Sequence, residues 1–317
     1  MGPVTGAARS AIGLDIGATK TLGVLLDEDD RVVAQVREAT EPGPEGVVRT
    51  AELVVARLGA ATDGTPAGSV GIGIPGLVDV ERGAVKHAVN LGLDGDWVML
   101  RDELERRLRV PVAVENDVNV ATLGAVALSG IRDLVYLSIG TGLAAGLVLD
   151  GTLRRGATGA AGEIGHVPID PSGAWCQCGQ RGCLEMVASG RALAEAWPPA
   201  GSDAPTGREN GGAPPAQALF AAAAAGDARA VAVKDRFAAG VADAVRTLCL
   251  SVDPATIVLG GGVAQLGAPL VEAVADALRA QAATSPFLAS LDLAARIRVV
   301  PADQPVAAIG AALLGRR

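Results

Sequence analysis

Apolar and polar positions in the first forty residues follow the pattern of β-strands. Within residues 10–39, three apolar runs are separated by two turn-like stretches, "DIGATK" and "DEDD", which predicts a meander of three short strands. Apolar residues then recur with helical spacing over residues 43–60, and residues 69–76 form an apolar run that ends in a Pro-Gly turn. The pattern therefore predicts a helix followed by a buried strand.

The remaining chain continues to mix helices and strands. We expect an amphipathic helix over residues 96–109, a strand over 110–117, a helix over 118–128, a strand pair with a glycine-rich turn over 134–156, a strand, turn and helix over 253–265, and a closing helix over 306–315. The second half thus repeats the opening theme, and this internal echo suggests a duplication. Residues 198–216 are rich in Pro, Gly and polar residues without periodicity, which predicts a mobile surface excursion.

Composition narrows the function further. The chain has 317 residues, of which 50% are hydrophobic, so it can bury one large core or two moderate ones, and its length slightly favours two domains. A formal net charge of -8 argues against a nucleic-acid partner, since such domains carry a clustered basic face. The N-terminal twenty residues resemble neither a signal peptide nor a membrane span. We therefore expect a soluble, cytoplasmic protein without a membrane partner.

Three of the four cysteines and one of the two histidines are concentrated in "EIGHVPIDPSGAWCQCGQRGCLE", residues 163–185. His166, Cys176, Cys178 and Cys183 make a Cys₃His set that suits a tetrahedral, structural zinc site. Gly179 and Gly182 permit the tight turns that such a site needs. The alternative is a loop of unpaired thiols, while Cys249 is expected in a buried helix and His87 at the surface or in a turn.

The stretch "DIGATK" carries candidate phosphate chemistry. Gly17 lets the backbone approach an oxyanion, Thr19 and Lys20 offer a hydroxyl and a cation, and Asp15 is placed to hold Mg²⁺ through water. An ordinary hairpin turn is the competing interpretation of this stretch.

Two further glycine-containing stretches suit a nucleotide. "IGTGLAAG", with Gly140, Thr141 and Gly142, occupies the equivalent turn in the second half, so the two turns together would clamp the β- and γ-phosphates. "LGGGVA", with Gly261 and Gly262, suits a base or ribose, although simple helix capping explains this stretch nearly as well.

The order of these motifs, with "GIPGLVD", "VEND" and "CQCGQRGCLE", resembles the ROK family of sugar kinases, repressors and related proteins over nearly the whole chain. Within that family the sequence is most similar to bacterial ATP-dependent glucokinases. The resemblance implies an α/β, two-domain actin-like ATPase (sugar kinase) fold with sugar in the cleft and a structural zinc loop. It places a small domain at 1–121, joined by the helix at 305–317, and a large domain at 122–304 with the zinc loop at 166–183.

The same resemblance implies the roles of individual residues. Asp117 is the expected general base, which accepts the proton of the 6-hydroxyl. His166 is expected to bind zinc through one ring nitrogen and the sugar through the other. The residues expected to hydrogen-bond the sugar are Asn90, Asn116, Asp117, Glu163, His166 and Glu185.

The expected activity is therefore phosphorylation of a hexose, with glucose as substrate, ATP as donor, Mg²⁺ and structural Zn²⁺, in a homodimer or homotetramer. N-acetylmannosamine or fructose remain alternative substrates. Many kinases of the family have glycine where this chain has Ala18, Ala144 and Ala145. Alanine at such turns is common in the family's repressors, so a sugar-binding sensor without catalysis is the competing function. Only about ten residues precede the first predicted strand, so we do not expect the helix-turn-helix of a repressor.

Overall fold

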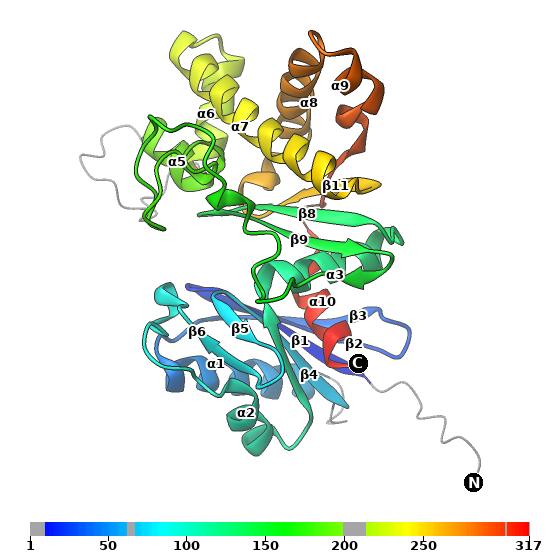
Figure 1. The fold of residues 1–317 in the computed structure, drawn as a ribbon. Coiled ribbons are helices and arrows are strands. Elements are labelled where there is room, and N and C mark those ends of the chain that lie inside the picture. The colour runs from blue at the N-terminus through cyan, green and yellow to red at the C-terminus, as the bar shows by residue number, and fades with distance from the viewer. Residues whose placement is uncertain (1–9, 62–66, 199–213, 302, 317) are drawn as a thin grey trace. The chain divides into compact units, whose positions relative to one another are not determined.

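The computed structural model of the chain describes residues 10–61, 67–198, 214–301 and 303–316. It divides into two compact units (Figure 1). The first comprises Met1–Arg132, Gly151–Ala161 and Pro305–Arg317, and the second comprises Asp133–Asp150 and Gly162–Gln304. The sequence placed a boundary after residue 121, which falls inside helix α3 (Asp117–Ser129); in the structure the whole helix belongs to the first unit.

The first unit contains a mixed five-stranded sheet with the order β3-β2-β1-β4-β7. Its strands are β1 (Ala11–Ile16), β2 (Lys20–Leu26), β3 (Val32–Ala39), β4 (Ser69–Ile74) and β7 (Val112–Asn116). Strands β1, β2 and β3 pair antiparallel, which confirms the predicted meander. Strands β1, β4 and β7 run parallel, so their carboxyl ends meet at one edge of the sheet.

The second sheet repeats this topology with the order β10-β9-β8-β11-β12. Its strands are β8 (Leu134–Ile139), β9 (Leu143–Leu149), β10 (Thr152–Leu153), β11 (Thr256–Gly260) and β12 (Ile297–Val299). Strand β8 pairs antiparallel with β9 and parallel with β11, and β11 pairs parallel with β12. The predicted internal echo is therefore present in both strand order and strand direction.

Helices surround the sheets in both units. Those of the first unit are α1 (Pro44–Ala60), α2 (Leu100–Leu108), α3 and α10 (Val306–Gly315), with a short hairpin of β5 (Leu77–Asp79) and β6 (Ala84–Lys86) and the 3₁₀ turn η1 (Val89–Leu91). Those of the second unit are α4 (Glu185–Ala188), α5 (Gly190–Ala196), α6 (Pro215–Ala224), α7 (Ala228–Val252), α8 (Ala268–Ala282) and α9 (Pro286–Leu291), with the 3₁₀ turns η2 (Ile164–His166), η3 (Val263–Leu266) and η4 (Leu293–Arg296).

Two predicted helices differ from the structure, and one predicted loop is mostly outside it. The helix expected at 96–109 begins only at Leu100, because the Val98 amide donates to the Val85 carbonyl at 2.9 Å in a β-bridge. The helix expected at the end of 253–265 is only the 3₁₀ turn η3. Of the excursion expected at 198–216, residues 199–213 lie outside the described residues, while Pro215 already begins α6.

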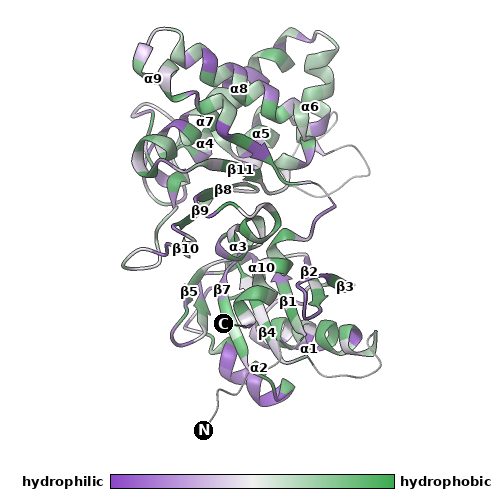
Figure 2. Cartoon of the chain, turned by 90° about the vertical axis from the view of Figure 1, so that its right-hand side faces the viewer, coloured by the Kyte–Doolittle hydropathy of each residue, from purple (hydrophilic) through white to green (hydrophobic). Residues whose placement is uncertain are grey.

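Helix α10 packs directly on the first sheet and on α3, and it is among the most hydrophobic elements in Figure 2, in contrast to the hydrophilic α2. The glycines that face this helix or belong to it are Gly13, Gly71, Gly124, Gly310 and Gly315. A Cβ on Gly310 would lie 1.8 Å from the Val120 carbonyl oxygen of α3. The backbones of α3 and α10 are therefore in contact, and no side chain fits between them at this point.

Among the helices of the described residues, none combines the length and apolar character that crossing a bilayer requires.

Replacing Gly310 with alanine should strongly destabilise the protein. The new methyl group would overlap the α3 backbone, so α10 must shift, and such overpacking typically costs about 1–3 kcal/mol. Gly59, near the end of α1, is a matched control because a Cβ there meets nothing within 4 Å. We expect Gly59→Ala to be neutral or to stabilise the helix by up to about 1 kcal/mol. Thermal unfolding of both variants measures the difference, and similar Tm values would contradict the packing described.

Candidate active site

The carboxyl edge of the first sheet collects acidic side chains from separate parts of the chain. In the strand register, Asp15 of β1 lies opposite Gly73 of β4, and Gly73 lies opposite Glu115 of β7. Because the three strands are parallel and end together, Asp15 comes close to Asp117, the residue that follows β7. The topology thus assembles the first half of the candidate site from residues about one hundred positions apart.

The turn after β1 is a tight connection between two antiparallel strands. The Gly17 amide donates to the Lys20 carbonyl at 3.0 Å, which closes the turn between β1 and β2. Ala18, Thr19 and Lys20 are all exposed, so the Thr19 hydroxyl and the Lys20 ammonium are accessible to a ligand. Ala18 has no positive φ, so the turn accommodates its methyl group without backbone strain.

Burial and the nearby charge of Asp117 raise the pKa of Asp15 to about 7, and Lys20 opposes this change. With a pKa of about 7, Asp15 changes its charge near neutral pH. This is unusual for a carboxyl group, and it occurs here beside a second carboxylate, Asp117. A bound cation would neutralise this pair, which fits the Mg²⁺ that the sequence predicted next to Asp15.

Asn116 and Asp117 occupy the junction between β7 and α3. Asn116 is the N-cap of α3, with its side-chain oxygen accepting from the Val118 amide at 2.9 Å and the Asn119 amide at 3.3 Å. Asp117 is therefore the first residue of the helix. The positive end of the helix dipole favours the ionised form of a carboxyl at this position.

Asn90 lies on the exposed 3₁₀ turn η1, which follows the β5–β6 hairpin. The side-chain amide of Asn116 donates to the Gly76 carbonyl at 3.3 Å, and Gly76 lies against the backbone of Lys86 and Ala88. The segment that carries Asn90 is thereby connected to the β7–α3 junction. His87 is exposed in the same segment with a φ of 59°, as expected for a turn.

The turn between β8 and β9 repeats the first turn in the second unit. The Gly140 amide donates to the Gly142 carbonyl at 3.1 Å, and Thr141 is exposed. Ala144 and Ala145 are outside the turn, since both pair with β8 residues as part of strand β9. Their methyl groups are therefore carried by strand β9 of the sheet and not by the turn.

The third glycine stretch packs against this turn. A Cβ on Gly261, which has a φ of 80°, would lie 2.7 Å from the Ile139 carbonyl oxygen at the end of β8. Gly262 is exposed and has open space around it. Gly261 is thus required by packing, whereas Gly262 leaves room for a ligand.

The Cys₃His set comes together in the second unit. The ligand atoms of His166, Cys176, Cys178 and Cys183 all lie within 4.8 Å of one another. His166 Nδ1 is 3.7 Å from the Cys176 sulfur, and the Cys178 and Cys183 sulfurs are 3.6 Å apart. Ligand atoms of tetrahedral zinc lie about 3.5–3.8 Å apart, given the usual bond lengths to nitrogen and sulfur. The side chains therefore fit a structural zinc ion.

Glycine permits the tight fold of this loop. Gly182 has a φ of 67°, and a Cβ there would lie 1.6 Å from the Asp170 carbonyl oxygen. The second nitrogen of the histidine, His166 Nε2, is 3.9 Å from Glu163 Oε2. The two ring nitrogens thus face two different groups, as the dual role expected of His166 requires.

Glu185 joins the zinc loop to the second turn. Its Oε2 accepts from the Leu143 amide at 3.3 Å, directly after Gly142, and its Oε1 lies 3.6 Å from the Cys176 sulfur. The carboxylate is thus fixed by both the turn and the loop.

Two residues of this cluster were missed by sequence reasoning. Arg191 donates to Glu185 Oε1 at 3.2 Å, and Gln180 donates to the Cys178 sulfur at 3.4 Å and to the His166 carbonyl at 3.1 Å. Hydrogen bonds from Gln180 are the main reason that the pKa of Cys178 falls to about 6, which favours the metal-binding thiolate. The position of Gln180 between two metal-ligand cysteines was the available signal; Arg191 had none.

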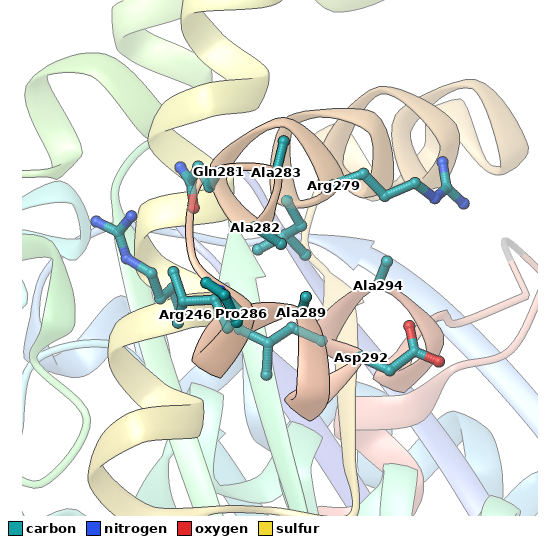
Figure 3. Close-up of a pocket in the computed structure, with 12 residues that line it drawn as sticks. Arg246, Arg279, Gln281, Ala282, Ala283, Pro286, Ala289, Asp292 and Ala294 are labelled. Carbon is teal, nitrogen blue, oxygen red and sulfur yellow. The ribbon is translucent and has the colours of Figure 1, made fainter.

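A separate cavity of about 480 Å³ lies among α7, α8, α9 and η4 (Figure 3). Its lining includes Arg246, Arg279 and Gln281 and contains none of the predicted site residues. Cys249 is buried in α7, as expected for a small apolar side chain.

Comparison with known proteins agrees with this arrangement. Residues 11–317 match the ROK family. A glucokinase of Thermotoga maritima is 37% identical over 284 residues, which cover 84% of this chain and 87% of that protein. An N-acetylmannosamine kinase of Citrobacter koseri is 32% identical over 262 residues, covering 80% and 83% of the two chains. The crystal structure of a ROK family glucokinase from Streptomyces griseus, in complex with glucose and AMPPNP, has 31% identity and a TM-score of 0.76, and covers 97% of this chain and 99% of that one.

The two mixed sheets and the motifs at their edges define an α/β fold of the ROK sugar kinase type. The chain belongs to the ROK family.

Freshly purified, reduced protein should contain about one zinc ion per chain, because the four side chains match its tetrahedral geometry. Cys178→Ser should lower the zinc content and reduce Tm by several degrees. Cys249→Ala, which changes a cysteine outside the cluster, should keep the zinc. Metal analysis by mass spectrometry provides the measurement, and parental protein without zinc would contradict the assignment.

The ligand-free protein should be stabilised by Asp15→Asn in a pH-dependent manner. Since the folded-state pKa of Asp15 is raised from 3.8 to about 7, its contribution to stability is fully present below pH 4 and is lost as the pH rises through 7. The asparagine variant avoids that loss, so its advantage should reach about 4 kcal/mol at pH 8 and less than half of that at pH 5. Denaturant unfolding at the two pH values tests this; an advantage independent of pH would argue against the raised pKa.

Proposed function

We propose that this protein is an ATP-dependent hexose kinase that converts glucose to glucose 6-phosphate. The observation that carries the proposal is the proximity of Asp117, at the start of α3, to Asp15 beside the β1–β2 turn. This arrangement brings a carboxylate base next to a predicted phosphate site. The glucokinase relatives and the glucose and AMPPNP complex of the Streptomyces griseus protein support the same activity.

The two glycine-containing turns are the proposed phosphate sites. Gly17, Thr19 and Lys20 would bind phosphate oxygens through the backbone, a hydroxyl and an ammonium group. Gly140, Thr141 and Gly142 would do the same from the second turn, and Gly261 and Gly262 would accommodate the nucleoside. Mg²⁺, held near Asp15 through water, would neutralise charge on the transferred phosphoryl group.

Hydroxyl groups of the sugar would be recognised by charged and amide acceptors. The proposed set is Asn90, Asn116, Glu163, His166 and Glu185. Glu185 is already fixed by Leu143 and Arg191, and a rigid carboxylate makes strong, directional hydrogen bonds to hydroxyl groups. Structural zinc would hold the loop that connects Glu163 to Glu185.

Asp117 is the proposed general base. As the sugar 6-oxygen attacks the γ-phosphorus, the bond from that phosphorus to the β,γ-bridging oxygen breaks, ADP leaves, and the 6-hydroxyl proton passes to the Asp117 carboxylate. The N-terminus of α3 favours the ionised form of a carboxyl at this position, and a general base must be ionised to accept the proton.

Replacing Asp117 with asparagine should separate catalysis from binding. The variant keeps the size of the side chain but cannot accept the proton, so kcat should fall at least about a hundredfold while hexose still binds. Asp102→Asn, which removes a first-turn carboxylate from α2 in the same unit, should change kcat less than about twofold. A coupled assay measures turnover and calorimetry measures binding. Near-parental turnover in Asp117→Asn would overturn the base assignment.

The substrate should be tested with the parental protein on a panel of glucose, fructose, mannose and N-acetylmannosamine. Highest kcat/KM for glucose would support the proposed substrate. A preference for N-acetylmannosamine would assign the protein to the activity named for its Citrobacter koseri relative. Sugar binding without phosphorylation of any hexose would favour the sensor function.

A further inference from the structure

Glu115 is a buried carboxylate that the proposed mechanism does not use. It is the penultimate residue of strand β7, directly before Asn116, and its side chain is only 2% exposed. Removing a carboxylate from water is costly unless hydrogen bonds and an opposite charge replace the lost hydration. The surroundings of Glu115 supply both.

Both oxygens of this carboxylate are engaged. Glu115 Oε1 accepts from the Asn116 amide at 2.9 Å and from the side-chain amide of Asn119 at 3.0 Å. Glu115 Oε2 accepts from Arg155 Nε at 2.6 Å. The ion pair with Arg155 thus balances the charge of Glu115, and the remaining bonds lead directly to the β7–α3 junction.

The two hydrogen bonds to Glu115 Oε1 come from residues that lie on either side of Asp117 in the sequence. Asn116 precedes it and caps α3 with its own side chain, while Asn119 lies in the first turn after it. One carboxylate therefore restrains the backbone before Asp117 and a side chain after it. A change in the position of Glu115 would be transmitted to both neighbours of the proposed base.

Arg155 brings a distant segment into this network. It lies in Gly151–Ala161. This segment belongs to the first unit, although in the sequence it separates the two parts of the second unit. The Ala161 amide donates to the Arg155 carbonyl at 3.1 Å, so the loop from 155 to 161 is closed on itself. The bond to Glu115 ties this closed loop to strand β7.

Stability alone is a poor explanation for this pair, because the desolvation of the buried Glu115 carboxylate offsets much of its attraction to Arg155, whose side chain is 35% exposed. Catalysis gives a better reason, since a small displacement of a reacting group can reduce turnover about a hundredfold. We infer that the Glu115–Arg155 ion pair is a positioning device, which holds Asn116 and Asp117 in the geometry that hexose binding and proton transfer require. The inference rests on the proposed kinase function.

The experiment uses substitutions that change one hydrogen bond at a time. In Glu115→Gln, the amide oxygen can still accept from Asn116 and Asn119, but the amide nitrogen faces Arg155, donor against donor. Arg155→Met removes the donor. Arg155→Gln keeps an N–H at the position of Nε without the charge, and in the double variant E115Q/R155Q the two amides can form a complementary hydrogen bond. Arg37→Gln, which changes an exposed arginine of β3 in the same unit, is the control.

We expect Glu115→Gln and Arg155→Met to lower kcat about tenfold and to raise the KM for hexose severalfold, with the KM for ATP within about twofold of the parental value. E115Q/R155Q should recover kcat to within about threefold of the parent, and Arg37→Gln should match the parent. Hydrogen exchange at residues 155–161 should accelerate in the two damaging variants and return towards the parental rate in the double variant.

Unchanged kcat in folded Glu115→Gln and Arg155→Met would overturn the inference, as would a double variant no better than the two single variants. An equal rise in the KM for both substrates would also overturn it, because general loosening of the fold would then explain the losses. If Glu115→Gln or Arg155→Met fails to fold, the kcat values of Arg155→Gln and of the double variant decide the question. Absence of phosphorylation by the parental protein with every hexose would instead refute the proposed function, and calorimetry of hexose binding to the same variants would then test the positioning of Asn116.

Discussion

The position of α3 in the first unit is constrained most tightly by packing, because the backbone of α10 is in direct contact with the backbones of α3 and of the sheet. At Gly310 and Gly124 the space for a methyl group is already filled by backbone of the opposite helix. Such contact leaves little freedom for α3 to slide, and α3 begins with Asp117. The position of the proposed base is therefore fixed in two ways. Packing against α10 holds the body of α3, and the Asn116 cap with the hydrogen bonds of Glu115 holds its first turn.

Charge at the edge of the first sheet acts against stability. Burial and the neighbouring carboxylate raise the pKa of Asp15, so the ligand-free protein holds two acidic groups closer together than folding alone would favour. Such an arrangement is typical of functional sites, where a bound ion or substrate supplies the missing charge. Glu115 shows the opposite solution, because the chain supplies its own counter-charge through Arg155. Asp15 is thus proposed to face a bound ion, whereas Glu115 is proposed to position Asn116 and Asp117.

The second unit uses a different means to make a rigid site. Its Cys₃His loop has few buried apolar residues, and the close spacing of its four ligand atoms offers a metal ion as the source of rigidity. Glu185 then connects this loop to the Gly140–Gly142 turn through the Leu143 amide. The proposed sugar-binding carboxylate and the proposed phosphate turn are thereby parts of one hydrogen-bonded cluster, so disturbance of the loop should reach both.

The sequence alone determined the elements and the local chemistry of this protein. Period-two and period-3.6 patterns located the meander, α1 and α10, and the short spacing of the cysteines located the Cys₃His cluster, because such signals depend on residues close together in the chain. Tertiary structure decided the rest. The start of α2 depends on a bridge between Val98 and Val85. The raised pKa of Asp15 and the partnership of Glu115 with Arg155 join residues that are far apart in sequence. Burial and pairing across such distances are properties of the folded chain, and no local pattern records them.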